Sequence, residues 1–70
     1  MKLNEWIKTV RKDSGLTMRD VAKETHYTAA TICHYERGDR KIPVDYLKYW
    51  ISKGYNLKLE EIEDEDIGHT

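Results

Sequence analysis

The chain contains 70 residues with a mass of 8.3 kDa, enough for one small domain but not for the large cleft of a conventional enzyme. Hydrophobic residues make up 39% and charged residues 36%, with two Trp and five Tyr, so we expect a folded domain. The single cysteine excludes an intramolecular disulfide, and no apolar run approaches the ~20 residues of a membrane span. The N-terminal segment lacks the apolar stretch of a secretory signal, so we expect an intracellular protein.

The formal net charge of −1 conceals an uneven distribution. Residues 1–53 hold eleven Lys and Arg against seven Asp and Glu, a balance of +4. Residues 54–70 hold one Lys against six acidic residues, a balance of −5. We therefore expect a modestly basic domain, residues 1–62, followed by an acidic tail without fixed structure, residues 63–70. The total charge does not exclude a nucleic-acid partner.

The first expected helix begins near Leu3 and ends at Gly15. Leu3, Trp6, Ile7 and Val10 recur at the spacing of one helical face, and Asn4 is a candidate N-cap. Gly15 suits the left-handed position that follows a helix.

The second expected helix begins after Thr17, a favourable N-cap. Asp20 follows three residues later, near the positive end of the helix dipole. We expect Val21, the small Ala22 and Thr25 on the inward face.

The third expected helix follows closely, capped by Thr28 and ended by Gly38. Its residues Ile32 and Tyr35 face the core. Two short helices joined by a tight turn, with the small Ala22 where they cross, have the plan of a helix-turn-helix.

The fourth expected helix begins at Pro43, which suits a first helical turn, and ends near Gly54. Its expected buried stripe comprises Val44, Leu47, Trp50 and Ile51. Beyond it two interpretations stay open: residues 55–60 alternate as a strand does, whereas residues 59–62 suit a short fifth helix.

A longer pattern covers more than half of the chain without a gap. It runs from Val10 to Ala22 as VRKDSGLTMRDVA, and continues at Tyr27, Thr28, Ile32, residues 35–38 and Pro43. From Ile7 to Pro43 the chain resembles the Cro/phage-repressor (XRE-like) helix-turn-helix family. The resemblance implies an all-α, compact, lambda-repressor-like domain of four to five helices, with a short C-terminal strand as an open alternative.

Three features depart from the pattern of that family. Met18 replaces the usual glutamine at the start of the second helix, and Ala29 and Ala30 occupy the leading positions of the recognition helix. His26 replaces the turn glycine, so a left-handed turn would hold a non-glycine residue at positive φ. The resemblance also implies a partly buried ion pair between Arg11 and Glu36, bonded as guanidinium and carboxylate.

Helix geometry predicts which residues of the third helix face DNA. The side opposite its core residues carries Ala30, Cys33, His34 and Arg37, with Ala29 at the leading edge. Alanine methyls pack against thymine methyl groups, His34 donates to a guanine or reaches a phosphate, and Arg37 suits a phosphate. Thr28 and Thr31 bond phosphates or base edges. The resemblance adds phosphate contacts from Thr17, Arg19, Arg40 and Lys41.

We expect neither a metal site nor a cofactor. Cys33 and His34 are adjacent, so on a helix their side chains point about 100° apart, and no second ligand pair is present at a suitable spacing. No nucleophile–base set or glycine-rich phosphate loop appears, so we do not expect an enzyme.

The aromatic residues after Pro43 exceed what one helix face buries, which leaves tyrosines on a flank. We expect a twofold dimer contact from this flank and the following segment, comprising Tyr46, Tyr49, Tyr55, Leu57 and Leu59. A dimer places two recognition helices about 34 Å apart on a pseudo-palindromic operator in double-stranded DNA.

These observations and the resemblance predict a sequence-specific DNA-binding transcriptional regulator. The resemblance and the small size imply a Cro-like repressor of a phage or mobile element. We expect it in the bacterial cytoplasm, associated with the nucleoid and not with a membrane. The alternative is a protein-interaction module, an anti-repressor or adaptor of the same fold that binds a partner through its acidic tail and aromatic surface.

Overall fold

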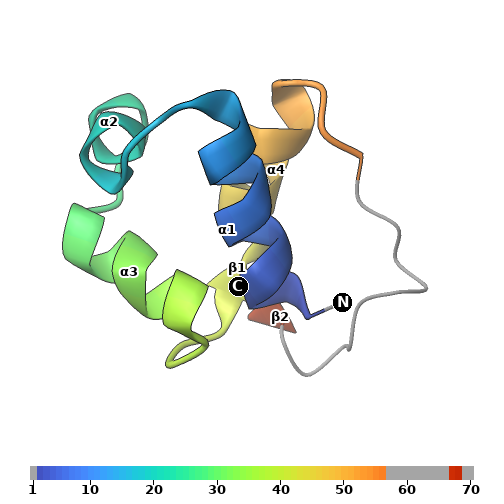
Figure 1. Cartoon of the computed structure of the whole chain (residues 1–70). Helices are drawn as coiled ribbons and strands as arrows, with labels where there is room; N and C mark the ends of the chain where they lie inside the picture. Colours follow the sequence, from blue (N-terminus) through green and yellow to red (C-terminus); the bar gives the residue numbers. More distant parts are fainter. Residues whose placement is uncertain (1, 57–66, 69–70) are drawn as a thin grey trace.

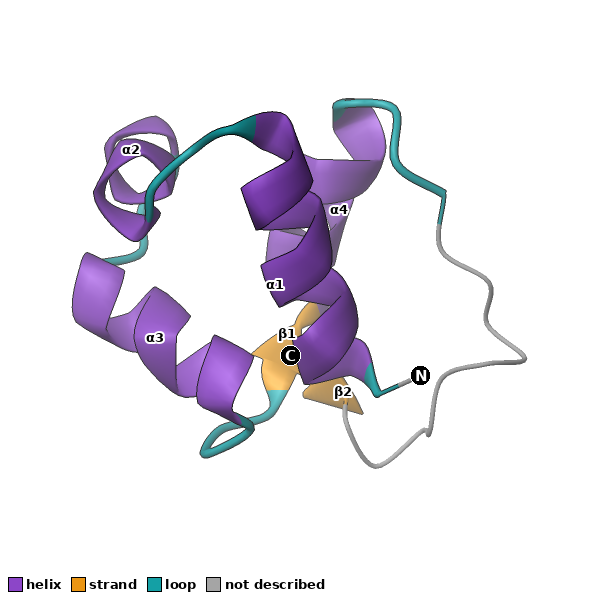
Figure 2. Ribbon diagram, viewed as in Figure 1, coloured by secondary structure: helices purple, strands orange, loops and turns teal. Residues whose placement is uncertain are grey.

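The structure, a computed structural model, describes residues 2–56 and 67–68 (Figures 1 and 2). In this part of the chain the helices are α1 (Leu3–Ser14), α2 (Met18–Glu24), α3 (Ala29–Arg37) and α4 (Val44–Ser52). Two short strands, β1 (Ile42–Pro43) and β2 (Ile67–Gly68), complete the described elements. Helix α3 contacts both α1 and α2, and α1 also contacts α4, so α1 and α3 link the other two helices. The expected four-helix, mainly α fold is confirmed.

Helix α1 begins two residues earlier than a cap at Asn4 would place it. Lys2 is the N-cap, and Asn4 lies inside the first turn, where its Nδ2 donates to the carbonyl of Glu36 at 3.2 Å. The expected cap at Asn4 is therefore wrong, because its amide bonds a distant helix end. At the other end Gly15 has a φ of 79° and donates its N–H to Lys12, as expected for a left-handed cap.

The turn between α2 and α3 is built without a left-handed residue. The Thr25 hydroxyl donates to the Val21 carbonyl at 3.0 Å and accepts from the Tyr27 N–H at 3.3 Å. Within the described residues no residue other than glycine has a positive φ. The positive φ expected at His26 is wrong, because the Thr25 side chain closes the turn with an extended backbone, φ −124° and ψ 178°.

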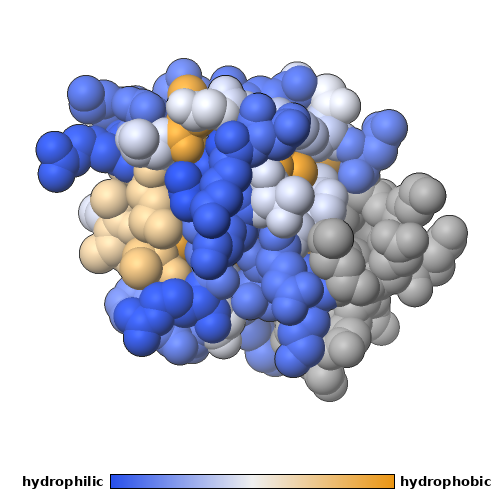
Figure 3. All heavy atoms as spheres, viewed as in Figure 1, coloured by the Kyte–Doolittle hydropathy of each residue, from blue (hydrophilic) through white to orange (hydrophobic). Residues whose placement is uncertain are grey.

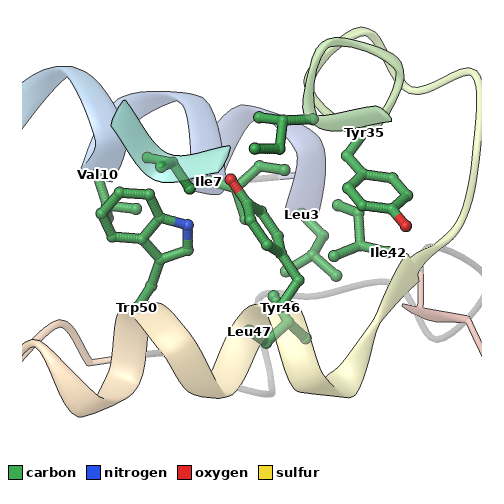
Figure 4. Close-up of a cluster of buried hydrophobic side chains, with 10 residues drawn as sticks. Leu3, Ile7, Val10, Tyr35, Ile42, Tyr46, Leu47 and Trp50 are labelled. Atoms are coloured by element: carbon green, nitrogen blue, oxygen red, sulfur yellow. The ribbon is translucent and has the colours of Figure 1, made fainter. Parts of the chain in front are cut away.

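The core lies between α1, α3 and α4 (Figure 4). Tyr46 and Trp50 extend from α4 toward α1, which contributes Ile7 and Val10, and Leu47 is buried in the same cluster. The prediction that Val44 and Ile51 belong to the buried stripe of α4 is wrong. Val44 is 39% exposed and Ile51 is 46% exposed, whereas Tyr46 is fully buried. Burying the large tyrosine ring removes more apolar surface from water than burying a valine does, which favours this rotation of the helix.

Strands β1 and β2 pair in parallel, with Ile42 opposite Ile67 and Pro43 opposite Gly68. Residues 67–68 belong to the segment, residues 63–70, that we expect to be an acidic tail. The strand expected at residues 55–60 is not found at Tyr55 or Asn56, which lie outside any described strand. The rest of that expected strand, and the alternative helix at residues 59–62, lie outside the described residues.

Candidate nucleic-acid interface

Helices α2 and α3 lie side by side at one flank of the molecule, joined by the short turn described above (Figure 1). Both begin with a threonine cap. The Thr17 hydroxyl accepts from the Asp20 N–H at 3.0 Å, and the Asp20 carboxylate accepts from the Thr17 N–H at 3.0 Å, a reciprocal capping box. The Thr28 hydroxyl accepts from the Thr31 N–H at 3.1 Å. Both expected caps are confirmed, so local sequence fixes where each helix of the unit begins.

A buried ion pair joins α3 to α1. Arg11 Nε and Nη2 donate to the two carboxylate oxygens of Glu36 at 2.6 and 3.0 Å, and Nη1 donates to the Leu16 carbonyl at 3.0 Å. The side chains are only 11% and 2% exposed. The hydrogen bonds that Arg11 donates to the Glu36 carboxylate raise the pKa of Arg11 above its ordinary value. The pair expected from the sequence is present, in the bidentate geometry that fixes one orientation between the two helices.

The side of α3 that faces away from the core carries small and apolar residues at its start. Ala30 is exposed, and Ala29, Cys33 and His34 are half-buried. Figure 3 shows a pale, apolar area over this flank of the molecule, bordered by hydrophilic atoms. Arg37 lies at the end of the helix with its side chain 64% exposed. The structure therefore leaves these residues of α3 accessible to a groove.

The two threonines at the start of α3 bond each other. The Thr28 hydroxyl donates to the Thr31 hydroxyl at 2.9 Å, in addition to its role as helix cap. Thr28 therefore has its proton and one lone pair engaged within the protein. The Thr31 hydroxyl keeps its own proton for an external acceptor, which makes Thr31 the better placed of the two for a phosphate or a base.

Exposed basic residues lie on either side of this face. Arg40 and Lys41 are exposed in the loop between α3 and β1, and Arg19 is exposed in the first turn of α2. Thr17 is exposed as well, with its hydroxyl engaged in the capping box. The candidate residues thus occupy the start of α2, the outward side of α3 and the loop that follows it.

An acidic residue that was not expected from the sequence, Asp39, lies within this surface. One carboxylate oxygen of Asp39, Oδ2, lies 3.3 Å from His34 Nδ1 and 3.4 Å from Arg37 Nε. The backbone N–H of Asp39 donates to the His34 carbonyl at 3.0 Å, just after Gly38 turns the chain with a φ of 84°. The sequence does contain an indication of this contact, because an acidic residue directly after a helix-ending glycine lies close to the last turn of that helix.

The expected dimer surface is corrected at Tyr46. Its side chain is fully buried, and burial raises its pKa to about 12. Its ring packs edge-to-face on Trp50 and on Tyr27, with centroids 6.3 and 5.6 Å away. A residue enclosed in this way cannot contact a second chain, because α4 turns it toward α1 and not toward the surface.

The two other described tyrosines of that set make contacts within the chain. The Tyr49 hydroxyl donates to the Glu24 carboxylate, which also accepts from Lys53 Nζ at 3.2 Å. Burial, followed by the bond to Glu24, raises the pKa of Tyr49. The Tyr55 hydroxyl donates to Asp13 at 3.0 Å. Both remain partly exposed, whereas Leu57 and Leu59 lie outside the described residues.

No three His, Cys, Asp or Glu side chains within residues 2–56 and 67–68 come close enough to share a metal ion. In the same residues, no helix combines the length and apolar character needed to cross a membrane.

The capped helix pair, the outward face of α3 and the flanking basic residues define a small helix-turn-helix domain. A family model described as helix-turn-helix (HTH_3) matches residues 7–62, and the chain belongs to this family. It is a family of DNA-binding transcription regulators of the Cro/XRE type, which the sequence resembles. Comparison with curated proteins gives no match, and neither does comparison with solved structures.

Proposed function

We propose that this chain is a sequence-specific transcriptional regulator that inserts α3 into the major groove of double-stranded DNA. The observation that carries the proposal is the outward face of α3, where exposed Ala30 and half-buried Ala29 and Cys33 leave the helix free to approach base edges closely. Exposed Arg37 and the basic loop at Arg40 supply phosphate contacts beside it.

The simplest mode of action is repression by occupying a promoter, as a Cro-like protein of a phage or mobile element in the bacterial cytoplasm. Recognition requires no cofactor and no catalysis, only placement of α3. We further propose that two copies bind a pseudo-palindromic operator together. The exposed apolar residues of α4, Val44 and Ile51, are better candidates for the dimer contact than the buried Tyr46.

A salt titration with random duplex DNA tests the proposed function. Binding that rests on several phosphate contacts weakens steeply as salt rises, because condensed counterions are released. Arg37→Ala and Lys41→Ala should each flatten the plot of log affinity against log salt by about one unit. Lys48→Ala, an exposed lysine on α4, is the matched control and should leave the slope unchanged.

Selection of bound sites from a random duplex pool then reports the half-site and its spacing together. Two half-sites one helical turn apart support the dimer, and a single half-site contradicts it. Absence of DNA binding at low salt would overturn the proposal. That result would favour the interaction module that uses the aromatic surface and the acidic tail.

A further inference from the structure

The carboxylate of Asp39 occupies an unusual place for an acid in a surface proposed to bind DNA. It follows α3 directly and contacts two residues of that helix that face the proposed groove, His34 at 3.3 Å and Arg37 at 3.4 Å. Its own backbone is held by the hydrogen bond to the His34 carbonyl, 3.0 Å long. The contact is therefore built into the end of the helix, and does not depend on a mobile side chain reaching from elsewhere.

The contact with Asp39 affects which ring nitrogen of His34 carries the proton. A carboxylate oxygen can only accept, so the contact favours the form in which Nδ1 carries the proton. In the neutral ring Nε2 is then a hydrogen-bond acceptor, and it lies on the side of the ring away from Asp39. In the major groove an acceptor pairs with an amino group, which adenine presents at N6 and cytosine at N4.

Asp39 also reduces the positive charge that Arg37 presents to a phosphate. Arg37 is 64% exposed, and Asp39 offsets part of its positive charge before any phosphate arrives. An exposed ion pair of this kind is weak, so a phosphate can displace the Asp39 carboxylate from Arg37. Breaking the pair reduces the binding free energy that Arg37 gains from the phosphate. This reduction applies equally to every DNA sequence, because phosphates are the same at each base step.

We propose that Asp39 is a positioning residue that increases discrimination between DNA sequences at the expense of non-specific affinity. It orients His34 so that Nε2 accepts from an adenine or cytosine amino group, and it partly neutralises Arg37 toward phosphates. This inference rests on the proposed function and adds to it the class of base edge that the end of α3 reads.

The test compares four proteins on two duplexes, one selected by the wild-type chain and one random. The proteins are wild type, Asp39→Ala, His34→Ala and the double variant. Asp39→Ala should bind random duplex about two- to five-fold more tightly, because one exposed acid is removed. The ratio of selected to random affinity should fall about five-fold or more, the lower range for one base contact. In the His34→Ala background, Asp39→Ala should leave that ratio unchanged.

Asp45→Ala is the matched control, because it removes one exposed acid from α4 and leaves α3 untouched. It should not alter the ratio of selected to random affinity. Site selection repeated with Asp39→Ala should lose the preference for adenine or cytosine at one position of each half-site.

A spectroscopic measurement separates positioning from a general effect on folding. Ring ¹⁵N shifts of His34 at about pH 8, where histidine side chains are ordinarily neutral, should show Nδ1 protonated in the wild-type chain. In Asp39→Ala they should move toward the other tautomer, while the helical circular dichroism stays the same.

The outcomes are distinguishable. If the wild-type chain binds neither duplex at low salt, the proposed function fails and this inference fails with it. If the wild-type chain binds, and Asp39→Ala leaves the affinity ratio or the tautomer of His34 unchanged, this inference alone is overturned. A fall of the ratio that persists in the His34→Ala background also overturns it.

Discussion

Among single side chains, Tyr46 is the one whose role changes most between sequence and structure. It is fully buried, and neither its hydroxyl nor the Trp50 indole nitrogen has a hydrogen-bond partner among the residues that the structure describes. A buried polar group without a partner loses its bonds to water and gains nothing in return. We expect Tyr46→Phe to raise the free energy of unfolding by about 1 kcal/mol, measured by urea denaturation. Tyr49→Phe removes the hydroxyl that donates to Glu24, so this control should not stabilise the chain.

If Tyr46→Phe instead lowers stability by a similar amount, the hydroxyl has a partner in the folded protein. That result would point to a bound water or to the Trp50 N–H, whose interaction with the hydroxyl acts to lower the pKa of Tyr46.

The same hydroxyl predicts a loss of stability in alkali. Burial raises the pKa of Tyr46 to about 12, above the ordinary tyrosine value of about 10. The folded state therefore binds the hydroxyl proton more tightly than the unfolded state does. The resulting contribution to the free energy of unfolding is fully present below about pH 10 and is lost as the pH rises toward about 12. Relative to Tyr46→Phe, the wild-type chain should lose about 1 kcal/mol between about pH 9 and about pH 11, measured by urea unfolding. Parallel pH profiles of the two proteins would contradict this.

The boundaries of the helices were predictable because their caps are local. Thr17 and Thr28 each accept from the N–H three residues ahead, and Gly15 and Gly38 have φ values of 79° and 84°. The rotation of α4 was not predictable, because Val44 and Tyr46 are both apolar and only packing against α1 decides which is buried. Local patterns therefore determine where each helix begins and ends, whereas tertiary contacts determine which face it buries.

In the candidate site too, some features follow from local sequence patterns and others depend on the three-dimensional path of the chain. Its residue types and their places on α3 follow from helical spacing, since Ile32 and Tyr35 are buried as expected. The contact between Asp39 and His34 depends on how the chain turns at Gly38, a backbone detail that apolar spacing does not encode.

The capping box of α2 carries a prediction about the helix-turn-helix unit. Thr17→Ala removes the acceptor for the Asp20 N–H and should lower the free energy of unfolding by about 1 kcal/mol in urea denaturation. Thr9→Ala, at an exposed position in the middle of α1, should be neutral or stabilising, because alanine favours helix. Equal losses for the two variants would contradict the cap.

We expect the loss of one partner of the buried ion pair between α1 and α3 to lower the free energy of unfolding more than the loss of one partner of an exposed pair. Glu36→Ala leaves the Arg11 guanidinium buried without its partner, so the free energy of unfolding should fall by about 3–5 kcal/mol in thermal or urea denaturation. Arg11→Met combined with Glu36→Leu removes both charges and should recover much of this loss. Arg37→Ala, from an exposed pair, should cost at most about 1 kcal/mol. A similar loss for Glu36→Ala and Arg37→Ala would refute the distinction.

For the molecule as a whole, the separation of charge matters more than the total of −1. The basic balance belongs to residues 1–53, which form α1 to α4, and the acidic run at residues 63–66 directly precedes β2. Strand β2 pairs with β1, and β1 directly follows the basic residues Arg40 and Lys41. The parallel pairing thus anchors the chain, just after its most acidic segment, beside the strand that follows the proposed phosphate-binding loop. We therefore expect the acidic run to oppose, by its negative charge, the approach of phosphates to the proposed phosphate-binding loop.

Neutralising the acidic run tests whether this field restrains DNA binding. The variant keeps β2 and changes four residues, Glu63→Gln, Asp64→Asn, Glu65→Gln and Asp66→Asn. We expect its affinity for random duplex to rise about three- to ten-fold at low salt, because repulsion of phosphates is removed, and to converge with wild type near about 1 M salt, where screening is short-ranged. Fluorescence anisotropy across a salt series measures both effects. An unchanged affinity at low salt would show that the acidic run does not oppose DNA, and its charge would then serve solubility or a protein partner.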